Sequence, residues 1–319
     1  MQNFQTSSEI KLGNQGIDFL SMNYDASEFI ILRHTLLTYY RKVGKSYKIQ
    51  QEMHNFISNW DIYDLILHPY EKFLGVIHKS NFKVCYTGLR FSQKKNKWLI
   101  YYNCQLLDVD NSLFFPLTFH LNPILNLINT TCNQALLEDQ IGLFLLQVRQ
   151  NTKKLRKYQI QGERIKYFDQ KKLIISICHK KIFIYKYYHF QPLHVYNAKC
   201  NIFDIIFNDQ GLIFIFCSSG LIIWDLNVQK RQQTIQLDPI LKNLSDQLQL
   251  YYLQGVIIFS TNDKTFYQLT LDGNKNEKPI KLTKEFPKFL SNSKGNIFFL
   301  LEYHQSTAKS NKLRVYEQL

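Results

Sequence analysis

The stretch from Asn201 to Leu237 constrains the fold more than any other part of the chain. It contains three short apolar runs and a fourth, alternating run, which are separated by polar segments: 202–207, 212–217, 221–226 and 231–237. Short runs rich in Ile and Phe between turn residues are typical of β-strands rather than of a helix. Asn208 to Gly211 is typical of a turn, because Asn, Asp and Gly tolerate left-handed backbone conformations. We therefore expect four antiparallel strands in a row.

The same alternation of runs and turns recurs along the whole chain of 319 residues. Four-stranded antiparallel units of about 40 to 45 residues are the blades of a β-propeller, and seven of them need about 300 residues. We expect an all-β fold, a seven-bladed propeller, in a single domain over residues 1–319. The expected blades span residues 16–52, 60–120, 122–161, 163–197, 201–237, 246–283 and 286–319.

Three parts of the chain depart from the regular repeat. The last blade is one strand short, and the strand-like segment 5–12 would complete it and close the ring, so that no sheet edge is left open. The second blade overruns between Arg90 and Asn111, which we interpret as an inserted hairpin or a long third-to-fourth strand connection. In the third blade, residues 121–146 are compatible with a helix as well as with strands.

The segment 201–237 resembles a WD40 repeat. Asp204 lies in its first strand, the turn 208–211 follows, and Trp224-Asp225 ends its third strand. The segment 61–86 follows the same pattern, whereas no Gly-His dipeptide opens either repeat. The resemblance implies a closed ring of blades and a role in protein interactions. It also implies that Asp204 accepts hydrogen bonds within its repeat and that Trp224 packs the blade.

Composition favours a well-packed intracellular protein. Hydrophobic residues make up 45% of the chain and aromatic residues 15%, which is enough for a large core. The six cysteines form no CxxC pair, and Cys85, Cys178 and Cys217 fall inside apolar runs, so we expect buried free thiols in a reducing compartment. The N-terminus has no apolar signal segment and no run is long enough for a membrane span. We expect a cytoplasmic or nuclear protein.

No catalytic motif is present, and we expect neither an enzyme nor a cofactor. The chain lacks a phosphate-binding glycine loop and the common hydrolase and metalloprotease motifs. Asp108 to Asn111 begins like a calcium loop but lacks its glycine and its final glutamate. His34, His78 and His179 each follow the second strand of a blade, where they form a polar ring or simply occupy a turn that tolerates histidine; we favour the second interpretation.

The net charge of +14 permits an acidic partner. In a WD40-type ring, the first-to-second and third-to-fourth strand loops share one face, and this face is expected to be basic. Its candidate residues for binding phosphate or an acidic partner are Arg41, Lys42, Lys45, Lys153, Lys154, Lys171, Lys172, Lys230 and Arg231. The alternative is that these are solvated surface residues in a chain rich in Lys, Asn and Ile.

The overrun of the second blade is a candidate docking element, because it breaks the repeat and combines cations with aromatic side chains. Its candidate residues are Lys94, Lys95, Lys97, Trp98 and Tyr101. Removing it is expected to leave the ring folded. We expect a non-enzymatic scaffold, one protein subunit of a larger intracellular complex; the alternative is a basic propeller associated with RNA or a ribonucleoprotein.

Overall fold

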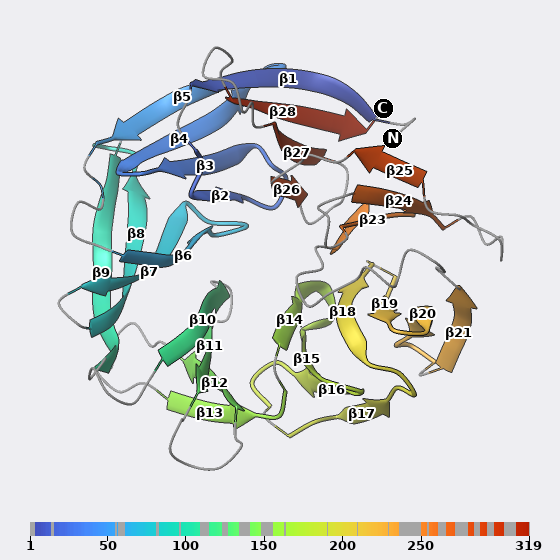
Figure 1. Ribbon diagram of the computed structural model, residues 1–319. Coiled ribbons are helices and arrows are strands. Elements are labelled where there is room, and N and C mark those ends of the chain that lie inside the picture. The colour runs from blue at the N-terminus through green and yellow to red at the C-terminus, as the bar shows by residue number, and fades with distance from the viewer. Residues whose placement is uncertain are drawn as a thin grey trace. The chain divides into compact units, whose positions relative to one another are not determined.

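The computed structural model is all-β, and its described strands form seven four-stranded antiparallel sheets (Figure 1). The only helical element among the described residues is the short 3-10 turn η1 (Asp169–Lys171). The sheets have a propeller arrangement in which five blades are recognised, and the count of seven blades stays a prediction. The structure describes residues 4–13, 16–54, 56, 61–80, 83–95, 97–108, 115–122, 127–133, 141–147, 156–162, 164–189, 191–208, 210–228, 230–235, 250–253, 255–260, 266–271, 280–283, 288–291, 297–302 and 311–318.

The chain groups into two compact units, and we describe each by itself. The first unit, residues 15–163, holds three sheets whose strands follow chain order. Its strands are β2 (Phe19–Met22), β3 (Glu28–Arg33), β4 (Leu36–Val43) and β5 (Ser46–Met53); β6 (Asp61–Leu67), β7 (Phe73–Ser80), β8 (Lys83–Ser92) and β9 (Lys97–Asp108); and β10 (Phe115–Asn122), β11 (Leu127–Asn133), β12 (Ile141–Gln147) and β13 (Arg156–Ile160).

The second unit comprises residues 1–14 and 164–319 and holds four sheets. Its first three sheets again follow chain order. Their strands are β14 (Arg164–Phe168), β15 (Leu173–Cys178), β16 (Lys181–Lys186) and β17 (His194–Asn197); β18 (Ile202–Phe207), β19 (Leu212–Cys217), β20 (Gly220–Asp225) and β21 (Lys230–Ile235); and β22 (Leu250–Leu253), β23 (Val256–Ser260), β24 (Phe266–Thr270) and β25 (Ile280–Thr283). The bounds of the four strands β18 to β21 match the sequence prediction to within about two residues.

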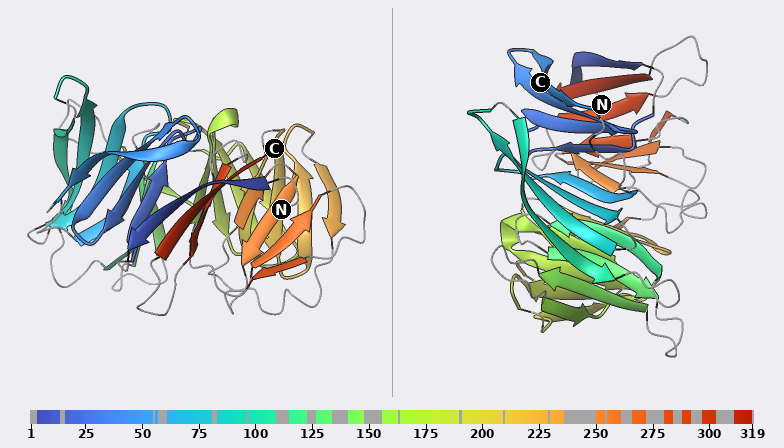
Figure 2. Two further views of the ribbon diagram at one scale, coloured as in Figure 1. Left: turned by 90° about the horizontal axis from the view of Figure 1, so that it is seen from above. Right: turned by 90° about the vertical axis from the view of Figure 1, so that its left-hand side faces the viewer.

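The last sheet is built from both ends of the chain. The strands β26 (Lys288–Ser291), β27 (Ile297–Glu302) and β28 (Asn311–Gln318) are completed by β1 (Phe4–Gly13). Strand β1 runs antiparallel to β28, with Phe4 opposite Gln318 and Gly13 opposite Asn311 (Figure 2). Glu9 adds ion pairs to Lys312 at 2.9 Å and to Arg314 at 3.4 Å. The N-terminal strand β1 thus supplies the fourth strand, which the C-terminal segment of the sequence does not provide.

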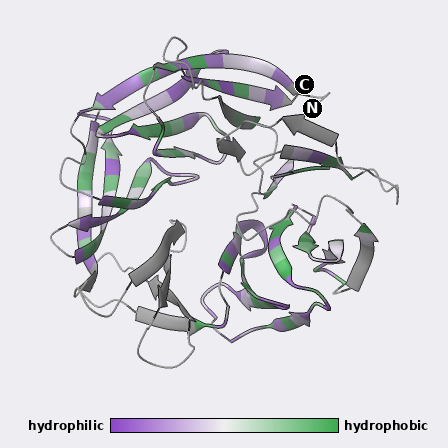
Figure 3. Cartoon of the chain, viewed as in Figure 1, coloured by the Kyte–Doolittle hydropathy of each residue, from purple (hydrophilic) through white to green (hydrophobic). Residues whose placement is uncertain are grey.

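Neighbouring sheets pack through apolar side chains of their inner strands. Every residue of β19 except Leu212 is buried, because this strand is covered on both faces. One face contributes Ile213 and Ile215 to a core shared with β15 and β16, and the other contributes Phe214 and Phe216 to a core shared with β23. Hydrophobic residues dominate β18, whereas hydrophilic residues recur along β9 (Figure 3). The inner strands are therefore specified by continuous apolar runs.

The prediction of an insertion in the second blade is wrong. Residues 97–108 form β9, the regular fourth strand of the sheet β6–β9, and it pairs with β8 from Lys83↔Asp108 to Ser92↔Lys97. β9, with 12 residues, is the longest described strand, and β8, with 10, is matched only by β1; these lengths displaced the apparent period in the sequence. Removing residues 90–111 would take away a whole strand together with the buried Trp98, so we now expect that deletion to unfold the sheet.

The third sheet is shifted relative to the prediction. The run 113–119, expected in the second blade, contributes to β10, the first strand of the third sheet. Consequently β11, at residues 127–133, is the second strand of this sheet. The helical alternative for residues 121–146 is excluded for the described part of that segment, because β11 and β12 pair in register from Leu127↔Gln147 to Asn133↔Ile141.

The turn after β18 has the predicted chemistry. Asn208 accepts a hydrogen bond from the Leu212 N–H through its side-chain oxygen at 2.9 Å, and its carbonyl accepts one from the Gly211 N–H at 3.2 Å. Gly211 has φ +93°, a conformation that side-chain-bearing residues rarely adopt. A Cβ at this position would lie 3.1 Å from Nδ2 of Asn227, so a larger residue would add a tight contact with this side chain to the strain of the backbone.

We predict that Gly211→Ala destabilises the protein more than Gly255→Ala does. Gly255 has a similar φ of +85°, but a Cβ added there would meet nothing within 4 Å, so its replacement costs about 1–2 kcal/mol of backbone strain alone. Gly211→Ala adds the contact with Asn227 and should cost about 1 kcal/mol more. Urea unfolding midpoints of the two variants measure the difference. Equal midpoints would show that Asn227 moves aside without cost.

Candidate interaction surface

Four turns of the first unit meet at one end of two neighbouring sheets. The Lys42 N–H donates to the Ser27 carbonyl at 2.8 Å, which holds the β4–β5 turn beside the β2–β3 turn. The Phe91 N–H donates to the Lys72 carbonyl at 3.0 Å in the next sheet, and the Tyr24 N–H donates to the Pro69 carbonyl at 2.9 Å between the sheets. We call the described residues of these turns, 23–28, 41–48, 68–72, 90–95 and 97, the turn surface. These contacts bring the two loop sets of the first two sheets together, as the prediction of a shared face requires.

The turn surface is strongly basic. Its carboxylates are Asp25, Glu28 and Glu71, and Glu28 is already engaged by Arg41 at 3.0 Å and by Lys72 at 3.8 Å. Although partial burial opposes it, hydrogen bonds from Ser27 and Asn23 lower the pKa of Asp25. The cations outnumber these carboxylates threefold: Arg41, Lys42, Lys45, Lys48, Lys72, Arg90, Lys94, Lys95 and Lys97.

A pair of tyrosines lies where the two sheets meet on this surface. The rings of Tyr24 and Tyr70 are 5.0 Å apart and tilted by 37°. Tyr70 is 64% exposed, on a turn that is held by hydrogen bonds from the Tyr70 and Glu71 N–H groups to Nδ1 of His68, at 3.1 and 3.0 Å. This aromatic pair was not identified from the sequence, because its two members are 46 positions apart and only the contact between sheets brings them together.

The structure separates the predicted basic residues into two groups. Arg41, Lys42 and Lys45 lie on the turn surface of the first unit. The exposed Lys171 and Lys172 lie at η1 in the second unit, where Nζ of Lys171 donates to Oδ1 of Asn227 at 3.2 Å. Lys230 and Arg231 follow in β21, where Lys230 stands opposite Asp225. Lys153 and Lys154 lie outside the described residues.

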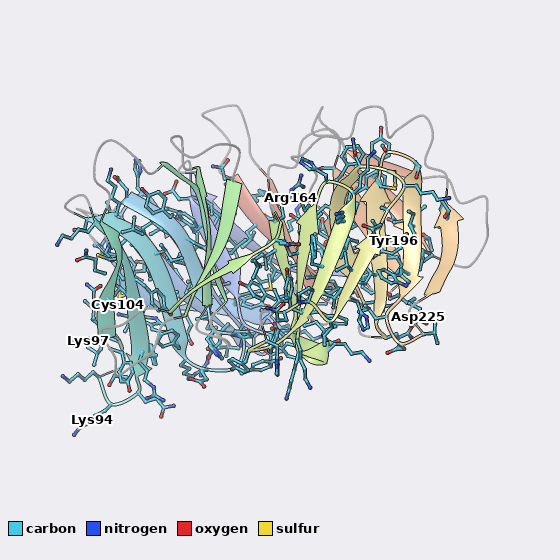
Figure 4. The ribbon with its side chains drawn as sticks, turned by 90° about the horizontal axis from the view of Figure 1, so that it is seen from below. Lys94, Lys97, Cys104, Arg164, Tyr196 and Asp225 are labelled. Atoms are coloured by element: carbon cyan, nitrogen blue, oxygen red, sulfur yellow. The ribbon has the colours of Figure 1, made fainter. Side chains whose placement is uncertain are left out.

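The hairpin of β8 and β9 carries most of the predicted docking residues. Lys94, Lys95 and Lys97 are exposed, and Lys94 lies at the tip of the hairpin (Figure 4). Tyr101 is 52% exposed, with the guanidinium of Arg90 5.7 Å from the centre of its ring.

Trp98 does not belong to this exposed set, and its assignment as a docking residue is corrected. Only 5% of Trp98 is exposed, and its ring packs 5.7 Å from that of Tyr39 and 5.4 Å from that of Phe91. It contributes to the core between the first two sheets. The sequence does not reveal that Ile100, two positions further on, is 64% exposed on the same strand. Positions 98 and 100 lie on the same side of the strand, so an apolar run does not show how far along that side the neighbouring sheet covers it.

Asp204 links two sheets, and its partner differs from the donors within its own repeat that the resemblance implied. Its carboxylate is 5% exposed in β18 and lies 2.9 Å from Nζ of Lys166 in β14. Arg164 of β14, which Figure 4 labels, donates to the carbonyl of Phe203, the residue that precedes Asp204. A buried carboxylate must be paired, and here the partner comes from the neighbouring sheet. Trp224 packs against Tyr196 of that same sheet with ring centres 4.2 Å apart, as expected of a packing residue.

The three histidines do not have a common role. His34 and His179 have positive φ values of 55° and 46° in tight hairpin turns, which supports the interpretation that these turns tolerate histidine. His78 is different: it lies within β7, is 1% exposed and has Nε2 2.9 Å from Oγ1 of Thr87. Burial lowers the pKa of His78 to about 4, so its imidazole is neutral at pH 7.

Cysteine and metal chemistry are not supported in the part of the chain that the structure describes. Cys217 is buried as predicted, whereas Cys85 and Cys178 are half-buried, and none of the three forms a disulfide within the described residues. Burial raises the pKa of Cys104 to about 11.

In the described ranges no three His, Cys, Asp or Glu side chains are grouped as metal ligands. No helix in these ranges has the length and hydrophobicity to cross a membrane.

Known proteins provide no further assignment. No protein-family model matches the chain, and a search of curated proteins finds no similar sequence. The turn surface and the β8–β9 hairpin therefore have to be interpreted from their own chemistry.

We predict that His78 makes stability pH-dependent. Its pKa is about 4 in the folded state against 6.5 ordinarily, so the unfolded chain binds a proton that the folded chain excludes between these values. The contribution is fully present above pH 6.5 and is lost as the pH falls towards 4. Between pH 7 and pH 5 the wild type should lose about 2 kcal/mol of unfolding free energy through this group.

Urea unfolding at pH 7 and pH 5 tests the prediction with two variants. His78→Gln keeps a polar side chain for Thr87 but does not titrate, so its unfolding free energy should fall by about 2 kcal/mol less than that of the wild type. His34→Asn, at an exposed turn position that suits asparagine, is the matched control and should behave as the wild type. A pH dependence that survives in His78→Gln would assign it to another group.

Proposed function

We propose that this protein is a seven-bladed WD40-like propeller that acts as a non-enzymatic interaction scaffold, a subunit of a larger intracellular complex in the cytoplasm or nucleus. The seven four-stranded sheets support the blade count, and β1 in the last sheet supports closure of the ring. The Trp224-Asp225 pair supports the WD40 assignment. Asp225 Oδ1 accepts the Asn227 N–H at 2.7 Å, which forms the turn that follows the third strand of that sheet.

The observation that carries the scaffold role is the outer face of β9. This strand lies at the edge of its sheet, and it exposes Ile100 by 64% and Tyr101 by 52% beside the cation Lys97. Exposed apolar side chains next to charges are typical of protein-binding surfaces, where a few buried anchors supply most of the affinity. β9 pairs with β8 from Lys97 to Asp108, and a register shift between Gly88 and Leu89 falls at Tyr101, between the pairs Leu89↔Ile100 and Gly88↔Tyr102.

The proposal predicts that a partner protein is lost when the outer face of β9 is made polar. The variant Ile100→Ser with Tyr101→Ser should reduce recovery of the partner by about fivefold or more, since each anchor is worth roughly 1 kcal/mol or more. Tagged wild type and variant are purified gently, with and without nuclease, and the co-purifying proteins are identified. The matched control is Val195→Ser, an exposed position (47%) on the outer strand β17.

The design separates the scaffold from the RNA-associated alternative. Protein partners that survive nuclease treatment, and that are lost only from the β9 variant, support the scaffold. Partners that disappear with nuclease in every sample favour the RNA-associated alternative. Equal recovery with the β9 variant and the wild type would reject β9 as the docking strand.

A further inference from the structure

We propose that the turn surface binds single-stranded nucleic acid, with a base stacked on Tyr70 and phosphates held by the surrounding lysines. The basis is a contiguous set of turns from two neighbouring sheets. Hydrogen bonds join Tyr24 to Pro69 and Lys42 to Ser27, and the hydroxyl of Tyr47 donates to the Ala26 carbonyl at 2.7 Å. The turns therefore present one continuous border rather than separate flexible loops.

Charge is concentrated at this end of the unit. The opposite end of the same two sheets has no cationic excess, with three cations and four carboxylates at its described turns and strand ends: Arg33, Lys79, Lys83, Asp18, Glu52, Asp61 and Asp108. The turn surface carries nine cations and three carboxylates, so a compositional excess of lysine spread evenly over the unit does not account for it. A polyanion gains affinity there through release of the counterions that its phosphates carry in solution.

The aromatic pair decides between the kinds of polyanion. Tyr24 supports one side of Tyr70 at 5.0 Å, and Tyr70 remains 64% exposed on the turn that also carries Lys72. Exposed aromatic rings inside a basic surface are the stacking sites on which proteins hold unpaired bases without sequence preference. An acidic peptide would use the cations but gain nothing specific from Tyr70. A duplex keeps its bases stacked on one another, so it would be limited to the phosphate contacts.

The turn surface and the outer face of β9 share Lys97 but use different aromatic and apolar residues, so this inference stands apart from the proposed scaffold. Ile100 and Tyr101 face a protein partner in that proposal, whereas Tyr70, Lys94 and Lys95 are used here. The variant Ile100→Ser with Tyr101→Ser should therefore keep its affinity for nucleic acid, and the failure of one proposal leaves the other testable.

Fluorescence anisotropy with the purified full-length chain and a labelled 12-nucleotide oligouridylate tests the inference. For about four phosphate contacts, affinity should fall by about 50-fold between 50 and 200 mM salt. Tyr70→Ala should weaken binding by about 5- to 100-fold, and Tyr70→Phe, which keeps the ring, should bind within about twofold of the wild type. Oligothymidylate of the same length distinguishes RNA from DNA as the strand that is bound more tightly.

The cation variants test the electrostatic part. Lys94→Gln with Lys95→Gln should reduce the slope of log affinity against log salt by about 1.4, since each lysine accounts for about 0.7 on a single strand. The matched control is Lys180→Gln with Lys181→Gln, two exposed lysines at the β15–β16 turn of the other unit, which should leave binding unchanged. Circular dichroism and urea midpoints equal to those of the wild type establish that each variant is folded.

Three results would overturn the inference. The first is no saturable binding of the oligonucleotide at 50 mM salt. The second is unchanged binding by folded Tyr70→Ala or by folded Lys94→Gln with Lys95→Gln. The third is a 12-residue polyglutamate that binds as tightly as the oligonucleotide, because that would identify an acidic peptide as the occupant.

Discussion

The structure depends on apolar packing between the faces of adjacent four-stranded sheets. Strand β19 shows the constraint: its side chains alternate between two cores, with Ile213 and Ile215 on one side and Phe214 and Phe216 on the other. A strand covered on both faces has no position left for a polar residue, so it appears in the sequence as an unbroken hydrophobic run. Burial of this area is the main favourable contribution to folding, at roughly 25 cal/mol per Å². Outer strands such as β5 and β17 have one uncovered face, and their polar residues are free to vary.

A small number of polar contacts orient the sheets that this packing brings together. In the second unit, Lys166 of β14 pairs with the buried Asp204 of β18. In the first unit, the hydroxyl of Ser21 in β2 accepts the Leu67 N–H of β6 at 2.9 Å. Such links are directional, whereas apolar packing is not, and they therefore determine which turns meet. The contact from Tyr24 to Pro69 belongs to this set and creates the turn surface.

The core and the two proposed binding surfaces use different residues of the same fold. The interior supplies rigidity, with the neutral His78 and the high pKa of Cys104 reflecting the cost of charge in buried positions. Surface side chains can therefore differ without disturbing the core. Lys94 lies in a hairpin turn close to the buried Trp98, so a flexible side chain projects from a fixed position. The two proposed surfaces use different parts of this hairpin, its tip and its outer face.

The sequence by itself determined the strands and their order, because short apolar runs and turns such as Asn208 to Gly211 are local properties of the chain. It also predicted the strand from the N-terminus that completes the last sheet. Two predictions were wrong: the insertion at residues 90–111 and the position of the third sheet. Both errors arose because β8 and β9 are longer than the strands that the repeat predicted. Only the tertiary structure decided that Trp98 is buried while Ile100 is exposed, that Asp204 pairs with Lys166, and that Tyr24 meets Tyr70. Each of these depends on contacts between sheets, and residues far apart in sequence carry no local signal of the face on which they will meet.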